Sequence, residues 1–459
     1  MCGIVGLMDP NGIENTVLEK MKDSLVHRGP DDAGIWISSD RMIGLAHRRL
    51  SILDLTVKGR QPMSDCNGRL WITYNGEIYN FKEIRTELEA KDYNFQTDTD
   101  TEVILYAYKE WGVDCLSRFN GMFAFCIYDL KQQILFLARD RVGKKPLYYL
   151  NQTNKFIFAS ELKAILQDPK VSKEIDLRAL NYYLSQGYIP SDLSIFSGIT
   201  KLKPGHAMLL DIESFKIKIW RYWEIPTALD QYTADDSLIE ELDHLLRDAI
   251  KLRMVSDVPL GVFLSGGLDS SLVVAMMSSI SDRPVKAFSI GFDEKHYNEL
   301  SYARIVAKYF GADLTEVILR PHVIDLLPSL VTQFDEPFAD SSLLPTFIVS
   351  KVAREMVTVA LSGDGGDEVF GGYLTYTDAL RRDHIFKWFP KSLHHAIKRA
   401  GHYLPGRGGF ISSTYDYFVD LYIQAYFRAR ERMSLFHRDI LSELGSDLDE
   451  PETSRRIMM

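Results

Sequence analysis

The pattern of apolar residues changes once along this chain, within residues 222–237, and no single type of sheet fits both sides of the change. Before it, short alternating runs typical of half-buried strands lie at residues 41–47, 70–74 and 121–128. Turn residues follow several of these runs, as at Asn75-Gly76, so we expect antiparallel hairpins. Two helical patterns interrupt the strands, at residues 15–25 and 101–111, which favours helices layered on sheets.

After the change, strands alternate with helices, as in a parallel, doubly wound sheet. We expect strands at residues 261–264, 285–291, 314–319 and 357–361, and helices at residues 270–279, 299–310, 322–334 and 343–356. A chain of 459 residues is too long for one compact core. We predict domains over residues 2–222 and 238–445, and a disordered tail over residues 446–459. Beyond Tyr373 the pattern is helical and aromatic, as at residues 415–432, which we interpret as packing.

Composition narrows the class of ligand. The formal net charge is -10, which argues against a surface for nucleic acids or anionic membranes, because phosphate groups require a basic field. Small metabolites are the expected partners. The four cysteines have no metal-ligand spacing, and we expect Cys115 and Cys126 to be buried. No apolar run is long enough to span a membrane and residues 1–8 do not resemble a signal peptide, so the cytoplasm is the expected location.

Cys2 directly follows the initiator Met1. If Met1 is removed, one residue carries both a thiol and a free α-amine, whose ordinary pKa values are about 8.5 and about 8. A nucleophile and a base would then belong to one residue near neutral pH. The alternative is a second-position cysteine that stands there by chance.

A glycine-rich segment, Leu264-Ser265-Gly266-Gly267-Leu268-Asp269-Ser270-Ser271, follows an expected strand and opens an expected helix. Glycines let the backbone approach a phosphate, hydroxyls donate hydrogen bonds, and a helix N-terminus favours an anion. The Gly-Lys-Ser/Thr of P-loop enzymes is absent. A plain structural turn is the alternative, but the acid Asp269 makes sense if Mg²⁺ bridges it to a pyrophosphate.

A second such segment, Ser362-Gly363-Asp364-Gly365-Gly366-Asp367-Glu368, also follows an expected strand. Loops at the C-terminal ends of strands in one parallel sheet face the same side, where open α/β sheets bind ligands. Asp364 and Asp367 are therefore candidate metal ligands, with a flexible acidic turn as the alternative.

Release of ammonia from an amide by Cys2 would need an oxyanion hole and groups that hold an amino acid. Asn75 and Gly76 suit an oxyanion hole, although Asn-Gly is also the strongest hairpin-turn signal. A ligand carboxylate fits one of Arg48 and Arg49, since strand alternation puts only one of them on the pocket face. Asp100 is the candidate for a ligand ammonium, because a capping box explains the nearby Thr99 and Glu102.

Six motifs taken together resemble those of glutamine-hydrolysing asparagine synthetases, in both domains and in order. They are Cys2-Gly3-Ile4, His27-Arg28-Gly29-Pro30-Asp31, Tyr74-Asn75-Gly76-Glu77-Ile78-Tyr79-Asn80, Gly121-Met122-Phe123-Ala124-Phe125, the segment at residues 265–271 and the segment at residues 361–373. Other N-terminal-cysteine amidotransferases share the first set but lack the pyrophosphate loop. The resemblance implies an αββα domain of the N-terminal-nucleophile hydrolase type, followed by an ATP pyrophosphatase domain with a doubly wound parallel sheet and C-terminal helices.

The resemblance also implies roles for individual residues. Cys2 would form a γ-glutamyl thioester, with Asn75 and Gly76 holding the oxyanion and Arg49, Glu77 and Asp100 binding glutamine. Ammonia would pass through an internal tunnel to the second domain, where ATP would adenylate aspartate. The implied ATP-binding residues are Leu264, Ser265, Gly266, Gly267, Leu268, Asp269, Ser270, Ser271, Ile290, Ser362 and Gly363, with Mg²⁺ at Asp269 and Asp367 and a catalytic Asp364 where other members carry glutamate.

The resemblance stops after Tyr373, where other members carry further helices with a lysine for the phosphates and an arginine-containing stretch. We therefore expect a chain truncated at its C-terminus. Two alternatives stay open: a different acceptor such as a sugar carboxylate, because Asp340-Ser341-Ser342 lacks a nearby arginine, and a chain that only hydrolyses glutamine or serves as a binding subunit. Whether the chain forms a homodimer is also open.

Overall fold

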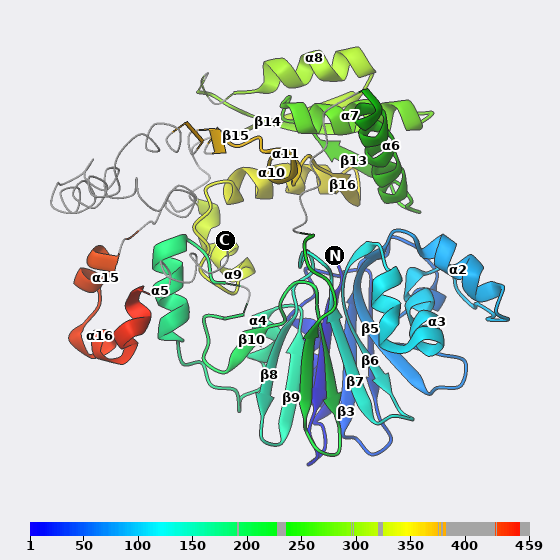
Figure 1. Ribbon diagram of the computed structural model, residues 1–459, viewed down its shortest axis with the longest axis vertical. Helices are drawn as coiled ribbons and strands as arrows, with labels where there is room; N and C mark the ends of the chain where they lie inside the picture. The colour runs from blue at the N-terminus through cyan, green and yellow to red at the C-terminus, as the bar shows by residue number, and fades with distance from the viewer. Residues whose placement is uncertain are drawn as a thin grey trace.

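The computed structural model describes residues 1–190, 192–226, 236–294, 296, 298–319, 325–374, 376–377, 380–381, 427 and 429–449. The first half of the chain forms a sandwich of sheets, and the second half forms a smaller sheet covered by helices that stands at one end of the sandwich (Figure 1). Within these residues, no helix has the length and apolar character that a membrane span needs.

The sandwich consists of two six-stranded sheets whose neighbouring strands pair antiparallel, as expected. The first sheet has the order β10-β8-β9-β1-β3-β2 and is built from β1 (Gly3–Met8), β2 (Asp32–Ile37), β3 (Ile43–Arg49), β8 (Tyr148–Gln152), β9 (Lys155–Ala159) and β10 (Ile199–Lys201). The second has the order β12-β11-β7-β6-β5-β4 and is built from β4 (Met63–Ser64), β5 (Leu70–Ile78), β6 (Gly121–Asp129), β7 (Ile134–Arg139), β11 (His206–Asp211) and β12 (Ile217–Arg221).

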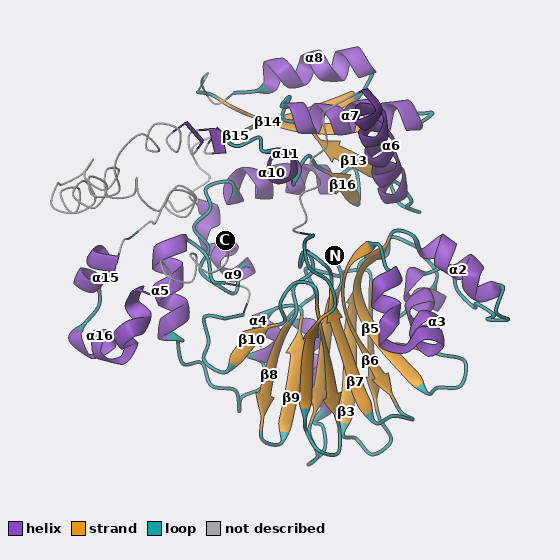
Figure 2. Ribbon diagram, in the orientation of Figure 1, coloured by secondary structure: helices purple, strands orange, loops and turns teal. Residues whose placement is uncertain are grey.

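Helices cover the two outer faces of the sandwich (Figure 2). They are α1 (Asn15–Asp23), α4 (Leu162–Ile165) and α5 (Leu177–Gln186) on the first sheet, and α2 (Phe81–Glu89) and α3 (Asp100–Trp111) on the second, with the short helices η1 (Val57–Gly59) and η2 (Gly112–Arg118) nearby.

Alternation along each strand divides its side chains between these layers. In β1, Ile4 and Met8 lie in the apolar cluster between the sheets, whereas Val5 and Leu7 lie in the cluster under α1 and α4. The result is the expected αββα order. The expected burial of Cys115 and Cys126 is also confirmed, since both are 0% exposed.

One local expectation in this domain is wrong. Asn75 and Gly76 do not form a hairpin turn but lie inside β5, where Asn75 pairs with Ala124 and Gly76 with Phe123. β6 runs beside β5 along its whole length, so sheet pairing overrides the local turn preference of Asn-Gly. The hairpin that joins β5 to β6 is therefore absent, and α2 and α3 lie between them in sequence.

The second domain has a parallel sheet of order β15-β14-β13-β16, built from β13 (Leu260–Phe263), β14 (Lys286–Phe292), β15 (Asp313–Leu319) and β16 (Val359–Leu361). Its helices are α6 (Asp236–Arg253), α7 (Leu268–Ile280), α8 (Leu300–Phe310), α9 (Leu327–Gln333), α10 (Leu343–Arg354) and α11 (Gly366–Phe370). One apolar cluster joins α6, α7 and α8 to one face, and a second joins α10 to the other, as in a doubly wound fold. Strand order reverses at β13, between β14 and β16.

The last described helices pack on the first domain. They are α15 (Ala429–Leu435), α16 (Arg438–Leu444) and η5 (Gly445–Asp449), and all three contact α5. Arg432, fully buried, donates to Asn181 Oδ1 at 2.7 Å and to Leu448 O at 2.8 Å. η5 carries this packing as far as Asp449, past residue 446, where we expected a disordered tail to begin. Residues 415–426 and 450–459 lie outside the described residues.

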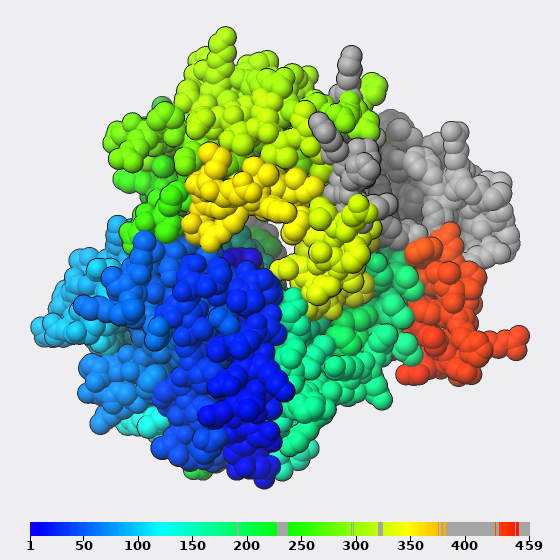
Figure 3. Space-filling model, turned by 180° about the vertical axis from the view of Figure 1, so that it is seen from behind, coloured from blue at the N-terminus to red at the C-terminus, as the bar shows by residue number. Residues whose placement is uncertain are grey.

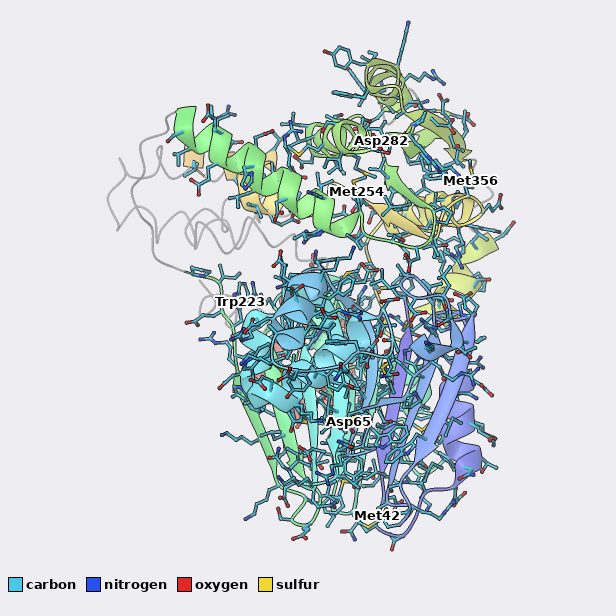
Figure 4. The ribbon with its side chains drawn as sticks, turned by 90° about the vertical axis from the view of Figure 1, so that its right-hand side faces the viewer. Met42, Asp65, Trp223, Met254, Asp282 and Met356 are labelled. Atoms are coloured by element: carbon cyan, nitrogen blue, oxygen red, sulfur yellow. The ribbon has the colours of Figure 1, made fainter. Side chains whose placement is uncertain are left out.

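Acidic side chains of the second domain join it to the first. Asp335 accepts a hydrogen bond from Lys163 N at 2.7 Å, and Glu336 accepts one from Ile195 N at 3.0 Å. Glu336 also forms an ion pair with Lys201 at 2.6 Å. In Figure 4, Trp223 lies beside the end of the sandwich nearest the second domain, and Met42 lies at the opposite end. The first domain therefore presents one end of its sandwich to the second.

Candidate active site

A cavity of about 290 Å³ lies at the end of the sandwich that faces the second domain. Its lining comes from several elements: Cys2 precedes β1, Arg49 ends β3, Asn75 and Gly76 lie in β5, and Asp100 begins α3. Thr358, Val359 and Ala360 line it from the second domain. The structure thus brings the predicted residues of the first domain into one cavity, which we call the Cys2 pocket. From behind, the space-filling view shows a hollow at the boundary between the two domains (Figure 3).

The thiol of Cys2 lies beside the backbone of Leu50, with its sulfur 3.4 Å from Leu50 N and 3.7 Å from Leu50 O. Burial raises the pKa of this thiol, so a base must remove its proton before it can attack. The terminal amine of this chain belongs to Met1, and burial lowers its pKa to about 5. An amine in this environment is neutral at pH 7 and can accept a proton.

Asn75 is 0% exposed, and neither its Oδ1 nor its Nδ2 atom has a hydrogen-bond partner within the described residues. Unpaired buried polar atoms cost about 1–3 kcal/mol, so they are rare unless a ligand satisfies them. The side chain lines the Cys2 pocket. Asn75 can therefore donate to a ligand oxygen without first breaking a bond inside the protein.

The N–H of Gly76 points away from β6. Phe123, its partner in the pairing, uses its own N and O atoms for Asp140, so the two residues form a non-hydrogen-bonded pair. On the same edge of β5, Tyr74 N donates to Gln61 and Ile78 N donates to Asp100. In the described part of the chain, the Gly76 N–H between them has no such side-chain acceptor. A side chain is excluded here, because a Cβ atom at this position would lie 2.1 Å from Met122 O.

The two adjacent arginines of β3 point in different directions, as strand alternation requires. Arg48 forms an ion pair with Asp23, whereas Arg49 is buried and lines the Cys2 pocket. Backbone carbonyls of the following loop hold its guanidinium: Nη1 donates to Thr56 O at 3.0 Å, and Nη2 donates to Leu53 O at 3.1 Å and to Asp54 O at 2.6 Å. Arg49 is thus a fixed cation at one side of the pocket.

Asp100 is a buried carboxylate that also lines the pocket. Its Oδ2 atom accepts from Tyr74 OH at 2.7 Å and from Ile78 N at 2.9 Å. Burial raises its pKa to about 6. Burial, and then the charge of Asp100, raises the pKa of the neighbouring Glu77 to about 7. A bound ammonium group would favour the ionised form of both carboxylates.

The acidic residues near Asp100 have separate structural roles. Thr99 Oγ1 accepts from Glu102 N at 3.3 Å as the N-cap of α3. The Glu102 carboxylate accepts from Gln96 N and Thr97 N. Thr99 thus caps α3, whereas the Glu102 carboxylate holds the loop before the helix and Thr99 N donates to Thr97 Oγ1, so the reciprocal bond of a capping box is not formed. Asp100 is left on the pocket.

Sequence reasoning missed Lys145, which is only 4% exposed and lines the Cys2 pocket. Burial lowers the pKa of its ammonium to about 8. Lysine is rarely buried, and no local pattern in the sequence marked this residue. The lining by Thr358, Val359 and Ala360 was also missed, because it depends on how the domains meet.

The first glycine-rich segment joins β13 to α7, as expected. Ser265 Oγ accepts from Gly267 N at 3.1 Å and lies 2.9 Å from Ser270 Oγ, and Ser271 Oγ bonds Gly267 O at 2.6 Å. Gly266 has a φ of +87°, which favours glycine. Leu264 is buried in the core, so it can offer only its backbone to a ligand, whereas Leu268 is exposed.

The second glycine-rich segment follows β16 and contacts the first. A Cβ atom at Gly366 would lie 2.4 Å from Asp269 Cγ, and one at Gly363 would lie 3.0 Å from Asp269 Cβ. The two loops therefore meet beside β13 and β16, where the strand order reverses and where such sheets bind ligands. Asp364 accepts from Ser362 Oγ at 2.9 Å, and Ile290 lies at the neighbouring strand β14.

A metal ion at this place would have to rely on few protein ligands. The residues that the structure describes contain no group of three or more His, Cys, Asp or Glu side chains arranged to hold a metal. Mg²⁺ in nucleotide sites needs only one or two carboxylates, with water and phosphate oxygens completing its shell. Asp269, packed against the loop that carries Asp367, fits that donor set.

Comparison with known proteins assigns the chain to a family. Residues 1–223 match the family model of the glutamine amidotransferase domain, and residues 241–453 match that of asparagine synthase. The chain is 44% identical over 414 residues to the putative asparagine synthetase [glutamine-hydrolyzing] 2 of Methanocaldococcus jannaschii, covering 86% of this chain and 79% of that protein. The chain belongs to the glutamine-hydrolysing asparagine synthetases. Members of this family are ATP-dependent ligases, as the resemblance of the motifs implied.

Other relatives extend the comparison. The asparagine synthetase [glutamine-hydrolyzing] 1 of Bacillus subtilis is 38% identical over 386 residues, which cover 83% of this chain and 60% of that protein. The chain thus spans less than two thirds of the length of this synthetase. Among solved structures, glutamine phosphoribosylpyrophosphate amidotransferase from B. subtilis aligns with a TM-score of 0.36 and 18% identity, over 70% of this chain and 67% of that chain.

Proposed function

We propose that this chain releases ammonia from glutamine at Cys2 and uses it to convert aspartate into asparagine at the expense of ATP. The observation that carries the proposal is the pairing, in one cavity, of the Cys2 thiol with the unpartnered side chain of Asn75. That pairing supplies a nucleophile and a preorganised donor for an oxyanion. Membership of the asparagine synthetase family supports aspartate as the acceptor and ATP as the nucleotide.

In the first half-reaction, the Cys2 sulfur attacks the side-chain amide carbon of glutamine. After removal of Met1, the α-amine of Cys2 takes the thiol proton and gives a proton to the departing ammonia. Asn75 Nδ2 and the Gly76 N–H stabilise the oxyanion of the tetrahedral intermediate. Water then hydrolyses the thioester, which releases glutamate and restores the thiol.

Glutamine itself would be held at its charged ends. Arg49 faces the α-carboxylate, and Asp100 with Glu77 faces the α-ammonium, an arrangement supported by their places on the pocket wall. The backbone carbonyls that accept hydrogen bonds from Arg49 fix the orientation of its guanidinium, so only a ligand carboxylate in the matching position can pair with it. These contacts bind glutamine and the transition state alike, so their main effect is on affinity.

In the second half-reaction, a carboxylate oxygen of aspartate attacks the α-phosphorus of ATP, giving β-aspartyl-AMP and pyrophosphate. Ammonia then attacks the activated carbon and AMP leaves. The serines and backbone N–H groups of residues 265–271, at the N-terminus of α7, would bind the pyrophosphate. Mg²⁺ at Asp269 and Asp367 would offset the negative charge of the phosphates. Ammonia would reach this site past Thr358, Val359 and Ala360, which line the Cys2 pocket.

The test is to supply glutamine, aspartate and ATP with Mg²⁺ and to measure glutamate, asparagine, AMP and pyrophosphate. We expect all four products, and glutamate formation should be lost in the Cys2→Ala variant but kept in Cys66→Ala, because Cys66 is exposed and lies outside the pocket. Pyrophosphate with a sugar acid but not with aspartate would indicate the alternative acceptor. Glutamate without AMP under any acceptor would reduce the function to hydrolysis of glutamine.

A cytoplasmic location and a homodimeric state also remain parts of the proposal. Light scattering on the purified chain tests the second, with a mass close to twice 52.5 kDa as the expected result. Fractionation of cells tests the first, with the chain expected in the cytoplasmic fraction.

A further inference from the structure

The loop after β3 carries the backbone atoms that hold Arg49. Leu53 O and Asp54 O both accept from Arg49 Nη2, at 3.1 Å and 2.6 Å. Ile52 and Leu53 also line the Cys2 pocket. The orientation of the guanidinium therefore depends on the shape of this loop, and above all on residues 52–54.

Asp257 of the second domain holds the same three residues from the other side. Its Oδ2 atom accepts from Asp54 N at 2.8 Å, and its backbone N–H donates to Ile52 O at 3.0 Å. These two bonds bracket Leu53, whose carbonyl contacts Arg49. Met254, three positions before Asp257, lies at the side of the second domain that faces the sandwich (Figure 4). The contact thus connects the domains at the glutamine site.

The segment that Asp257 holds is strained. Asp54 has a φ of +51°, which is uncommon for a residue other than glycine and persists only where the surroundings enforce it. Its own carboxylate accepts from Thr56 N at 3.1 Å and from Asp98 N at 3.2 Å. Its N–H donates to Asp257 and to no other acceptor among the described residues. Loss of the Asp257 acceptor would leave that N–H unpaired and favour relaxation of the loop.

Asp257 also lies close in sequence to β13 and to the glycine-rich loop that we expect to bind the nucleotide. Pro259 O accepts from Thr358 N at 2.9 Å, and Thr358 lines the Cys2 pocket. β13 begins at Leu260 and leads directly into the loop at residues 264–271. A displacement of β13 would therefore be transmitted through Asp257 to the loop that holds Arg49.

We propose that Asp257 is a positioning residue of the glutamine pocket: it holds residues 52–54 in the shape that aims Arg49 at the ligand carboxylate, so that the second domain sets the affinity of the first for glutamine. The inference rests on the proposed hydrolysis of glutamine. Asp257 does not line the pocket and acts through the loop.

The experiment compares Asp257→Ala with Asp257→Asn in the full chain. Asp257→Ala removes the acceptor for Asp54 N, and we expect the KM for glutamine to rise about tenfold with kcat within twofold, because Arg49 contributes equally to substrate and transition-state binding. Asp257→Asn keeps an acceptor oxygen at the same reach, so its KM should stay within about twofold of the wild-type value. Asp282→Ala, an exposed site on the second domain away from this boundary (Figure 4), is the matched control.

A second measurement isolates the carboxylate contact. Alkylation of Cys2 by iodoacetamide, which has no carboxylate, should proceed at the same rate in all variants. Inactivation by a diazoketone analogue of glutamine should need about tenfold more reagent in Asp257→Ala. If that variant does not fold, Asp257→Ser, whose shorter side chain cannot reach Asp54 N, takes its place in both assays.

Three results would overturn the inference: an unchanged KM in Asp257→Ala, a fall in kcat at constant KM, or an Asp257→Asn variant as impaired as Asp257→Ala. These failures are distinct from a failure of the proposed function, which would show as a wild-type chain that releases no glutamate from glutamine.

Discussion

The sulfur of Met1 lies 3.0 Å from the ammonium nitrogen of Lys145, inside the pocket that also holds the Cys2 thiol. The initiator methionine therefore occupies space in the pocket and holds the nitrogen of Cys2 in a peptide bond, where it cannot act as a base. Arg28 Nε donates to Cys2 O at 2.8 Å, which keeps the backbone of Cys2 in place independently of Met1. Removal of Met1 would open the pocket and turn the amide nitrogen of Cys2 into a free α-amine that can act as a base.

Retention of Met1, or of an N-terminal tag, should therefore abolish the use of glutamine. We expect glutamate release to fall at least ~100-fold, the range that loss of a general base typically causes. Asparagine formation from free ammonia should persist, since the second domain is untouched. Mass spectrometry of the N-terminus, run beside both assays, checks the correlation, and full glutaminase activity in a chain with Met1 retained would contradict it.

Asn75→Ala should lower kcat for glutamine hydrolysis by about 10²–10³, because one oxyanion donor is lost. The melting temperature should not fall, since the deleted atoms are buried without partners and face an existing cavity. Asn151→Ala, at an exposed position of β8, is the control for both measurements. A large loss of stability in Asn75→Ala would show that the side chain has a structural partner instead.

Ionisation of the Asp100 carboxyl should lower the free energy of unfolding as pH rises from about 4 to about 6. Its folded-state pKa of about 6 lies above the ordinary value of about 3.9, so the folded chain binds the proton more tightly. The stabilisation is fully present below pH ~4 and is lost as pH rises through ~6. Thermal melts across this range should show a steeper decline for the wild-type chain than for Asp100→Asn, and parallel curves would refute the assignment.

Arg432→Ala should release the C-terminal helices from α5. The variant loses charge-assisted bonds to Asn181 and Leu448, each typically worth about 1.5–3 kcal/mol, so the free energy of unfolding should fall by about 2 kcal/mol or more. Limited proteolysis should then cut near residues 429–449 earlier than in the wild-type chain. Arg178→Ala, which removes a looser ion pair with Asp447 at 3.8 Å, should change stability by about 0.5 kcal/mol or less.

Local rules predicted many elements of the fold because they act within a few residues. Gly311 directly follows the helix expected at residues 299–310 and is the left-handed C-cap of α8, with a φ of +66°. Thr99 caps α3 as its capping-box position predicted. Alternation along β1 sorted Ile4 and Met8 from Val5 and Leu7 into different layers. Each of these outcomes depends on the backbone geometry of one helix or strand.

Local rules failed where a distant segment decided the outcome. Asn75-Gly76 has the strongest local turn preference in the first domain, yet β6, more than forty positions along the chain, pairs with it and keeps it extended. Residues 446–449 have no strong helical pattern, but Asn181 and Arg432 hold their carbonyls. In both cases hydrogen bonds between remote residues outweighed the preference of the segment itself.

By itself, the sequence determined the residue types, the order of the two motif sets and hence the family: a cysteine behind Met1, an Asn-Gly pair and two glycine-rich loops are local facts. Only the tertiary structure decided that Lys145 is buried beside Cys2, that backbone carbonyls hold Arg49, that Thr358 lines this pocket from the second domain, and that Asp257 contacts the loop after β3. The reason is physical: these relationships join residues that are far apart in the chain, and a contact of that kind exists only after both domains have folded and met.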